Sequence, residues 1–134
     1  MKAIGLIRCE KNEEGCPLTG CFKSLRAGDN GYAVHGEEEL VLQGVMTCRC
    51  PGEDAPAKAK VLKAKGAQAI HFATCTFAGK QDGAWTLGLG FCQDIEDIAH
   101  RVASETGLPC VLGSAHLPAG YKTVVFGDED ADQD

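Results

Sequence analysis

Cysteine is the residue type with the greatest capacity for chemistry in this chain, which carries eight cysteines and four histidines among its 134 residues. Two of the cysteines, Cys48 and Cys50, have a single residue between them and lie after an apolar run and before the turn Pro51-Gly52. Thiolates are ligands of zinc and of iron–sulfur centres, and a thiolate of low pKa is the nucleophile of thiol–disulfide exchange. The pair therefore predicts a metal site or a redox site.

The surroundings of this pair favour negative charge. Arg49 lies between the two cysteines, and the turn leads toward a helix that Asp54 is expected to cap. A cation and a helix N-terminus both stabilise thiolates. A Cys-x-Cys pair can chelate one metal ion, although structural zinc sites more often place two residues between their cysteines. Packing of the pair within a turn stays open as the alternative.

Composition narrows the class of protein. Five of the 19 acidic residues lie within 128–134, which leaves 14 acidic against 13 basic residues in the rest of the chain. This near-neutral balance lacks the excess of basic residues that binding to nucleic acid or to an anionic membrane would favour. There is no apolar run of membrane-spanning length and no export signal, so we expect a cytoplasmic protein. In that compartment, metal binding or thiol chemistry is favoured over structural disulfides.

The hydrophobic pattern predicts an α/β fold for a single cysteine-rich domain over 1–127, followed by an acidic disordered tail over 128–134. Strands are expected at 3–8, 40–46, 67–73 and 109–112, with a short edge strand at 121–126. Helices are expected at 19–27, between Asp54 and Gly66, and between Asp94 and Gly107. Alternation of these elements predicts three layers, a mainly parallel sheet of about four to five strands with helices on both faces.

Three further expectations concern helix faces and a loop. The helix after Asp54 is expected to bury Ala57, Val61 and Ala64 and to expose its lysines. The helix after Asp94 is expected to bury the four residues Ile95, Ile98, Ala99 and Val102. The Gly-rich segment 77–90 is expected to be a long loop, of the kind that often acts as a functional lid, in which Trp85 packs.

In open parallel sheets, sites form beyond the carboxyl ends of the strands. Each of the four main predicted strands delivers a Cys or a His to that edge, and two more cysteines lie in the loop that returns from it. The candidate metal ligands are therefore Cys9, Cys16, Cys21, Cys48, Cys50, Cys75 and His116. Cys92 is left undecided. Core or structural roles are predicted for Cys110 and His71, and surface positions for His35 and His100.

Several stretches in order resemble one family of small bacterial and archaeal proteins, the CGGC domain proteins. These stretches are Ile7-Arg8-Cys9, Cys16-Pro17 with Thr19-Gly20-Cys21-Phe22-Lys23, Cys50-Pro51-Gly52, 70–75, Cys92 before the last long helix, and 113–116. The resemblance covers residues 2–116 and implies a metal-binding domain. The chain departs from the family pattern at the Cys-Gly-Gly-Cys motif that is the hallmark of the family, where this chain has Thr47-Cys48-Arg49-Cys50.

Three functions follow from these patterns. The first is a binding module for zinc or another thiophilic metal. The alternative is a thiol–disulfide redox protein that uses Cys48 or Cys50, and the second alternative is iron–sulfur binding. The absence of GxSxG, HExxH and paired carboxylates disfavours a hydrolase, and the absence of GxGxxG disfavours dinucleotide binding. The pattern names no protein partner.

Overall fold

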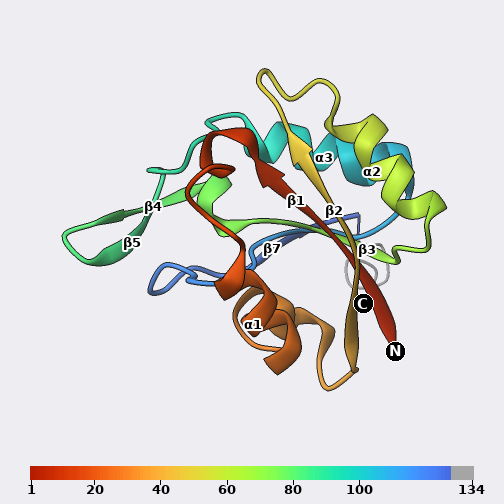
Figure 1. Ribbon diagram of the computed structural model, residues 1–134, viewed down its shortest axis with the longest axis horizontal. Coiled ribbons are helices and arrows are strands. Elements are labelled where there is room, and N and C mark those ends of the chain that lie inside the picture. The colour runs from red at the N-terminus through yellow and green to blue at the C-terminus, as the bar shows by residue number, and fades with distance from the viewer. Residues whose placement is uncertain (128–134) are drawn as a thin grey trace.

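The computed structural model describes residues 1–127, so the predicted acidic tail lies outside the described residues. A five-stranded sheet forms the centre, in the order β2-β1-β3-β6-β7 (Figure 1). Its strands are β1 (Lys2–Cys9), β2 (Leu40–Cys48), β3 (Ala69–Phe72), β6 (Cys110–Leu112) and β7 (Val124–Phe126). The first four are parallel and β7 is antiparallel, which confirms the predicted α/β class.

Helices cover both faces of this sheet, as predicted. α2 (Ala55–Ala64) and α3 (Ile95–Thr106) lie together on one side, while α1 (Thr19–Ala27) lies on the other (Figure 1). The apolar core divides accordingly: Ile7 packs toward α2 and α3, whereas its neighbour Leu6 packs toward α1. This division follows from the alternation of side chains along a strand. Within residues 1–127 no helix has the length and apolar character needed to cross a bilayer.

The buried face of α3 is the predicted one, but that of α2 is not. α2 buries Ala55, Pro56, Ala59 and Leu62, whereas Val61 is 45% exposed. The reason lies in the sheet beneath. A Cβ at Gly5 or at Gly44 would come within 3.0 Å of the Leu62 side chain, so these two glycines make room for it. The prediction used only the spacing of apolar residues within the helix, and the space above these two glycines cannot be seen from that spacing.

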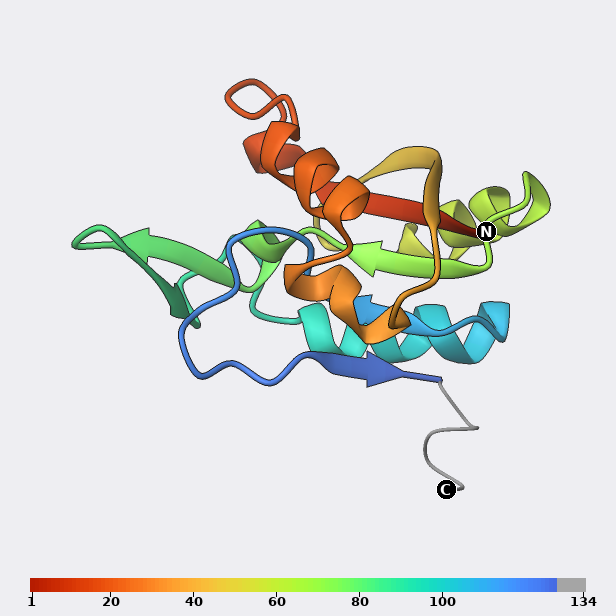
Figure 2. The ribbon, with the colours of Figure 1, turned by 90° about the horizontal axis from the view of Figure 1, so that it is seen from below.

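Segment 77–90 is not a loop. It forms the hairpin β4 (Ala78–Gln81) and β5 (Ala84–Leu87), which extends away from the main sheet (Figure 2). The turn residues Asp82 and Gly83 have φ of 52° and 81°. Two positive φ values are the requirement of a type I′ turn, which Asp-Gly satisfies, so the sequence did contain a hairpin signal.

The strand order brings the predicted site residues to one edge. Strand order reverses between β1 and β3, and such a switch point opens a crevice at the carboxyl ends of the strands. Cys9 and Cys48 end β1 and β2 and are partners in register. Cys75 lies in the 3₁₀ turn directly after β3, and His116 follows β6. The edge predicted from the sequence is therefore formed.

Candidate thiol site

Four cysteines line one cavity of about 250 Å³ at this edge; they are Cys9, Cys48, Cys50 and Cys92, and we call the cavity the four-thiol pocket. Three segments supply them, namely the end of β1, the end of β2 with its turn, and the approach to α3. Cys92, which sequence reasoning left undecided, is thus a member of this group. Its position just before a helix that starts at the same edge was the available signal.

The turn after β2 closes onto α3 because residue 52 is glycine. Gly52 has φ of 88°, and a Cβ there would lie 2.5 Å from Cδ1 of Ile98 and 3.6 Å from Sγ of Cys48. Both the backbone conformation and the space therefore exclude a larger residue. The N–H of Gly52 donates to the carbonyl of Arg49 at 2.6 Å and fixes the turn.

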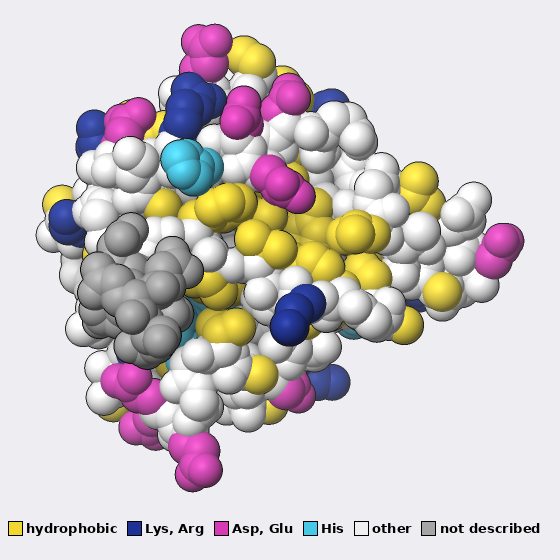
Figure 3. Space-filling model, turned by 180° about the vertical axis from the view of Figure 1, so that it is seen from behind, with side chains coloured by type: hydrophobic (Ala, Val, Ile, Leu, Met, Phe, Trp, Pro, Cys, Tyr) yellow, Lys and Arg dark blue, Asp and Glu magenta, His cyan; other side chains and the backbone are white. Residues whose placement is uncertain are grey.

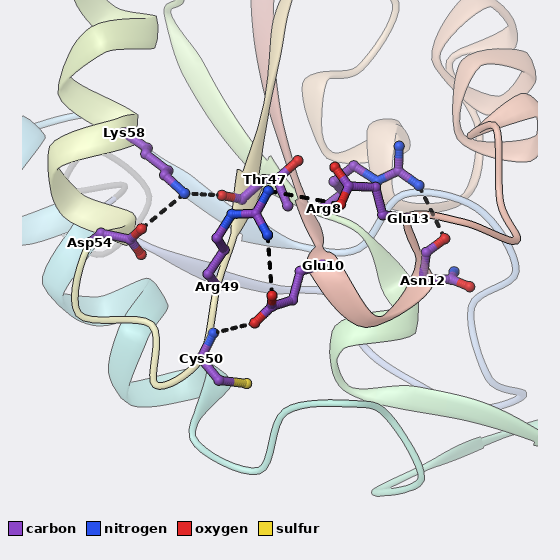
Figure 4. A network of polar contacts seen from close by, with 9 residues as sticks. All are labelled: Arg8, Glu10, Asn12, Glu13, Thr47, Arg49, Cys50, Asp54 and Lys58. Carbon is purple, nitrogen blue, oxygen red and sulfur yellow. Dashed lines mark hydrogen bonds and ion pairs between the residues drawn. The ribbon is translucent and has the colours of Figure 1, made fainter.

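Arg49 points away from the thiols, toward the segment that follows β1 (Figure 4). Its guanidinium lies 3.2 Å from Oε1 of Glu10 and 3.8 Å from Oε1 of Glu13. The other oxygen of Glu10 accepts the backbone N–H of Cys50 at 2.8 Å. Glu10 thus ties the Cys-Arg-Cys turn to the end of β1. The expectation that Arg49 favours thiolates is wrong for Cys48, because its charge is paired with carboxylates.

Two thiols of the pocket, those of Cys48 and Cys92, are held in their protonated form. Burial raises the pKa of Cys48 to about 11, with Asp54, Cys92 and Cys9 adding to the shift and Lys58 opposing it. Burial likewise raises the pKa of Cys92, helped by the charges of Asp94, Cys50 and Cys9. Ionisation of one thiol would therefore disfavour ionisation of the neighbouring thiols. Because its pKa is raised, Cys48 is a poor nucleophile at neutral pH.

The other predicted ligands gather in a different cavity, of about 240 Å³, whose lining includes Cys16, Cys21, Cys75, His116 and Trp85. We call it the three-thiol pocket. Its cysteines pack with Leu6 and Leu18 on the side of α1, whereas Cys48 and Cys92 pack on the side of α2 and α3. The seven candidates therefore share an edge but divide between the two faces of the sheet.

A third cavity, of about 580 Å³, adjoins the start of α3 and contains one thiol, that of Cys92. Phe77, Tyr121 and Val124 supply apolar walls, and Glu96 is among its acidic residues. Hydrophobic side chains also gather at the centre of the molecular face in Figure 3, with acidic side chains along their border. Because Cys92 lines this cavity as well as the four-thiol pocket, it can be approached from both.

Three histidines have surroundings that bear on their predicted roles. His71 is fully buried, and its Nδ1–H donates to the carbonyl of Gly113 at 2.8 Å, which confirms a structural role. His35 was predicted to be a surface residue, but it is partly buried and its Nε2 lies 2.8 Å from Nε2 of His71. His100 is exposed, as predicted. Cys110 is fully buried in β6, and burial alone raises its pKa.

The donor set of the four-thiol pocket fits a thiophilic cation. Four sulfurs from three chain segments match the ligands of structural zinc. In addition, Oδ1 of Asp54, whose charge acts on Cys48, is buried and accepts no hydrogen bond within the described residues. No three Cys, His, Asp or Glu side chains of residues 1–127 are already placed to coordinate a metal ion. Coordination would therefore require the thiols to close on the ion.

Comparison with known proteins confirms the resemblance. The sequence model of the CGGC domain family matches residues 3–115. Uncharacterized protein MJ0582 of Methanocaldococcus jannaschii is 32% identical over 123 residues, which cover 85% of this chain and 87% of the relative. No solved structure matches. The chain therefore belongs to the CGGC domain family, a membership that points to a metal-binding role.

Proposed function

We propose that this protein binds zinc at the four-thiol pocket, with Cys9, Cys48, Cys50 and Cys92 as ligands. The observation that carries the proposal is the convergence of these four side chains on one cavity from three chain segments. Four cysteines form one of the established kinds of closed zinc site, in which the ion links segments that are distant in sequence. The role that best fits is structural or regulatory binding.

Proton release is the main energetic consequence of this proposal. A thiol must lose its proton to become a zinc ligand, and burial keeps Cys48 and Cys92 protonated in the metal-free protein. The ion replaces those protons and cancels the mutual repulsion of the thiolates. The Asp54 carboxylate, whose Oδ2 is paired with Nζ of Lys58 at 2.9 Å, keeps its buried Oδ1 without a hydrogen-bond partner on the same side of the sheet.

Thiol–disulfide exchange is the second candidate, and the exposure of Cys50 favours it. The raised pKa of Cys48 excludes that residue as the attacking thiolate at neutral pH, which leaves Cys50 as the nucleophile. Cys92 is the natural resolving partner because it lines the same cavity. Iron–sulfur binding would use the same sulfurs and would colour the protein.

Metal analysis of protein purified without oxygen separates these functions. We expect bound zinc without visible absorption, and one zinc fewer in Cys48→Ala and in Cys92→Ala. The matched control is Cys110→Ala, which removes a thiol that lines neither pocket and should leave the zinc content unchanged. Zinc content that is equal in Cys92→Ala and Cys110→Ala would overturn the proposal. A visible absorption band together with stoichiometric iron would indicate that the site binds an iron–sulfur cluster and not zinc.

A further inference from the structure

We propose that the three-thiol pocket is a second, separate site for a thiophilic d¹⁰ cation such as Zn²⁺, with Cys16, Cys21, Cys75 and His116 as its ligands. This inference extends the proposed metal binding to a second site on the opposite face of the sheet. Three sulfurs and one imidazole form the Cys₃His set of structural zinc sites. The two sets share no ligand, so each site can fill without the other.

Local contacts fix two of the three thiols. The guanidinium of Arg8 donates to the carbonyls of Asn12 and Cys16 and so folds the loop back onto β1. The N–H of Leu18 then donates to Sγ of Cys16 at 3.4 Å. Sγ of Cys21 lies 3.0 Å from Oγ of Ser114, in the segment after β6. These contacts position Cys16 and Cys21, and coordination would still require the donors to close on the ion, as in the four-thiol pocket.

Three features define the position of His116 at this pocket. Its φ of 54° is left-handed, a conformation that non-glycine residues seldom adopt and that is concentrated at functional sites. Nε2 of its imidazole would lie 2.8 Å from a Cβ at residue 20, so glycine in α1 permits the close approach. The ring stacks on Trp85 of the hairpin, with centroids 5.1 Å apart and planes 3° apart. Trp85 thus forms part of the wall of the pocket.

The separation of the two pockets follows from strand geometry. The cysteines of the three-thiol pocket belong to the apolar cluster under α1, which includes Leu6 and Ala73. Cys48 and Cys92 pack instead against the cluster under α2 and α3, which includes Ile7. Leu6 and Ile7 are consecutive residues of β1 and point to opposite faces. The two groups of sulfurs therefore lie on opposite faces of the sheet.

Trp85 provides a readout, because it is the only tryptophan of the chain and it stacks on His116. It also packs against the apolar cluster under α2 and α3, so the variants below assign the fluorescence change to one site. We would titrate reduced, metal-free protein with Zn²⁺ alone and follow tryptophan fluorescence together with stoichiometry by native mass spectrometry. The expected result is two zinc ions per chain and a change in fluorescence that accompanies one of them. Cys75→Ala and His116→Asn should each lose one ion and the fluorescence change. Asn is chosen because it tolerates a left-handed backbone.

Cys92→Ala tests independence from the first site. It should lose one ion and keep the fluorescence change, while Cys110→Ala should behave as the wild type. If only the four-thiol proposal fails, Cys92→Ala will bind as the wild type does and Cys75→Ala will still lose the fluorescence change. The second site is overturned if Cys75→Ala and His116→Asn, folded by circular dichroism, both keep the fluorescence change. It is equally overturned if Cys92→Ala abolishes that change.

Discussion

The histidine in the centre of the sheet should make this protein sensitive to acid. His71 is fully buried, its ring is stacked on Tyr32 at 4.3 Å, and its Nδ1–H donates to Gly113. Its other nitrogen must then accept a hydrogen bond, which Nε2–H of His35 supplies at 2.8 Å. Burial lowers the pKa of His71 from 6.5 to about 3, with the charges of His35 and Lys2 acting in the same direction.

The sign and size of the effect follow from proton linkage. In the unfolded chain a histidine binds its proton near pH 6.5, whereas folded His71 stays neutral down to about pH 3. Stability is therefore fully present above pH 6.5 and is lost as the pH falls from 6.5 toward 3. Each pH unit in that window costs about 1.4 kcal/mol, so this one residue should remove ~2 kcal/mol at pH 5.

The perturbation that isolates this contribution is His71→Asn, since an asparagine amide can still donate toward Gly113 but does not titrate. Urea unfolding followed by circular dichroism would be measured at pH 7.5, 6, 5 and 4. Between pH 7.5 and 5, the free energy of unfolding of the wild type should fall by about 2 kcal/mol more than that of the variant.

The control is His100→Asn, at an exposed histidine, which should follow the pH dependence of the wild type. His71→Asn is expected to start from a lower stability because it loses the Tyr32 stack, but only the slope of the free energy of unfolding with pH decides the question. Parallel pH profiles for the wild type and His71→Asn would refute the reasoning.

Two further predictions concern the four-thiol pocket and the 3₁₀ helix Asn30–His35. Zn²⁺ binding should release one proton fewer in Cys48→Ala than in the wild type at pH 7.5, because the pKa of Cys48 is about 11. An indicator dye in weakly buffered solution measures the protons released, and equal release in both proteins would contradict the assignment of Cys48 as a ligand. Gly31→Ala should lower the free energy of unfolding by about 1–3 kcal/mol, because a Cβ there would lie 2.4–2.5 Å from backbone atoms of Gly113. Gly15→Ala, with nothing within 4 Å of the added Cβ, is the control, and an equal loss in both would contradict the steric argument.

Much of the fold was predictable because its strongest signals are local. Apolar runs set β1, β2 and β3, and the helix 19–27 was predicted with the bounds that α1 has. Which face of α2 is buried was not predictable from the sequence. The space above Gly5 and Gly44 that the Leu62 side chain fills exists only when β1 and β2 are paired. The hairpin β4–β5 was missed although Asp82-Gly83 indicated its turn, because glycines in and after the strands weakened the strand pattern.

The edge that gathers the cysteines was also predictable, but their division was not. Strand ends in a parallel sheet meet at one edge whatever their exact register, so Cys9, Cys48 and Cys75 could be placed together. The face that each side chain takes depends on where each strand ends to the residue, which is the least certain quantity in a sequence-based prediction. For the same reason Cys92, at the start of a helix, could not be assigned to a pocket.

The altered hallmark illustrates how a shortened spacing can keep a site. β2 ends at Cys48, and Arg49 and Cys50 lie in the turn that follows it, which the bond from the N–H of Gly52 to the carbonyl of Arg49 closes. Within this turn Cys50 lines the same cavity as Cys48, while Arg49 turns outward to Glu10. One residue between the cysteines therefore preserves a pair of thiols in one pocket, and it adds an outward cation that ties the turn to β1. A change of Arg49 should then affect the order of the turn before it affects the donor set.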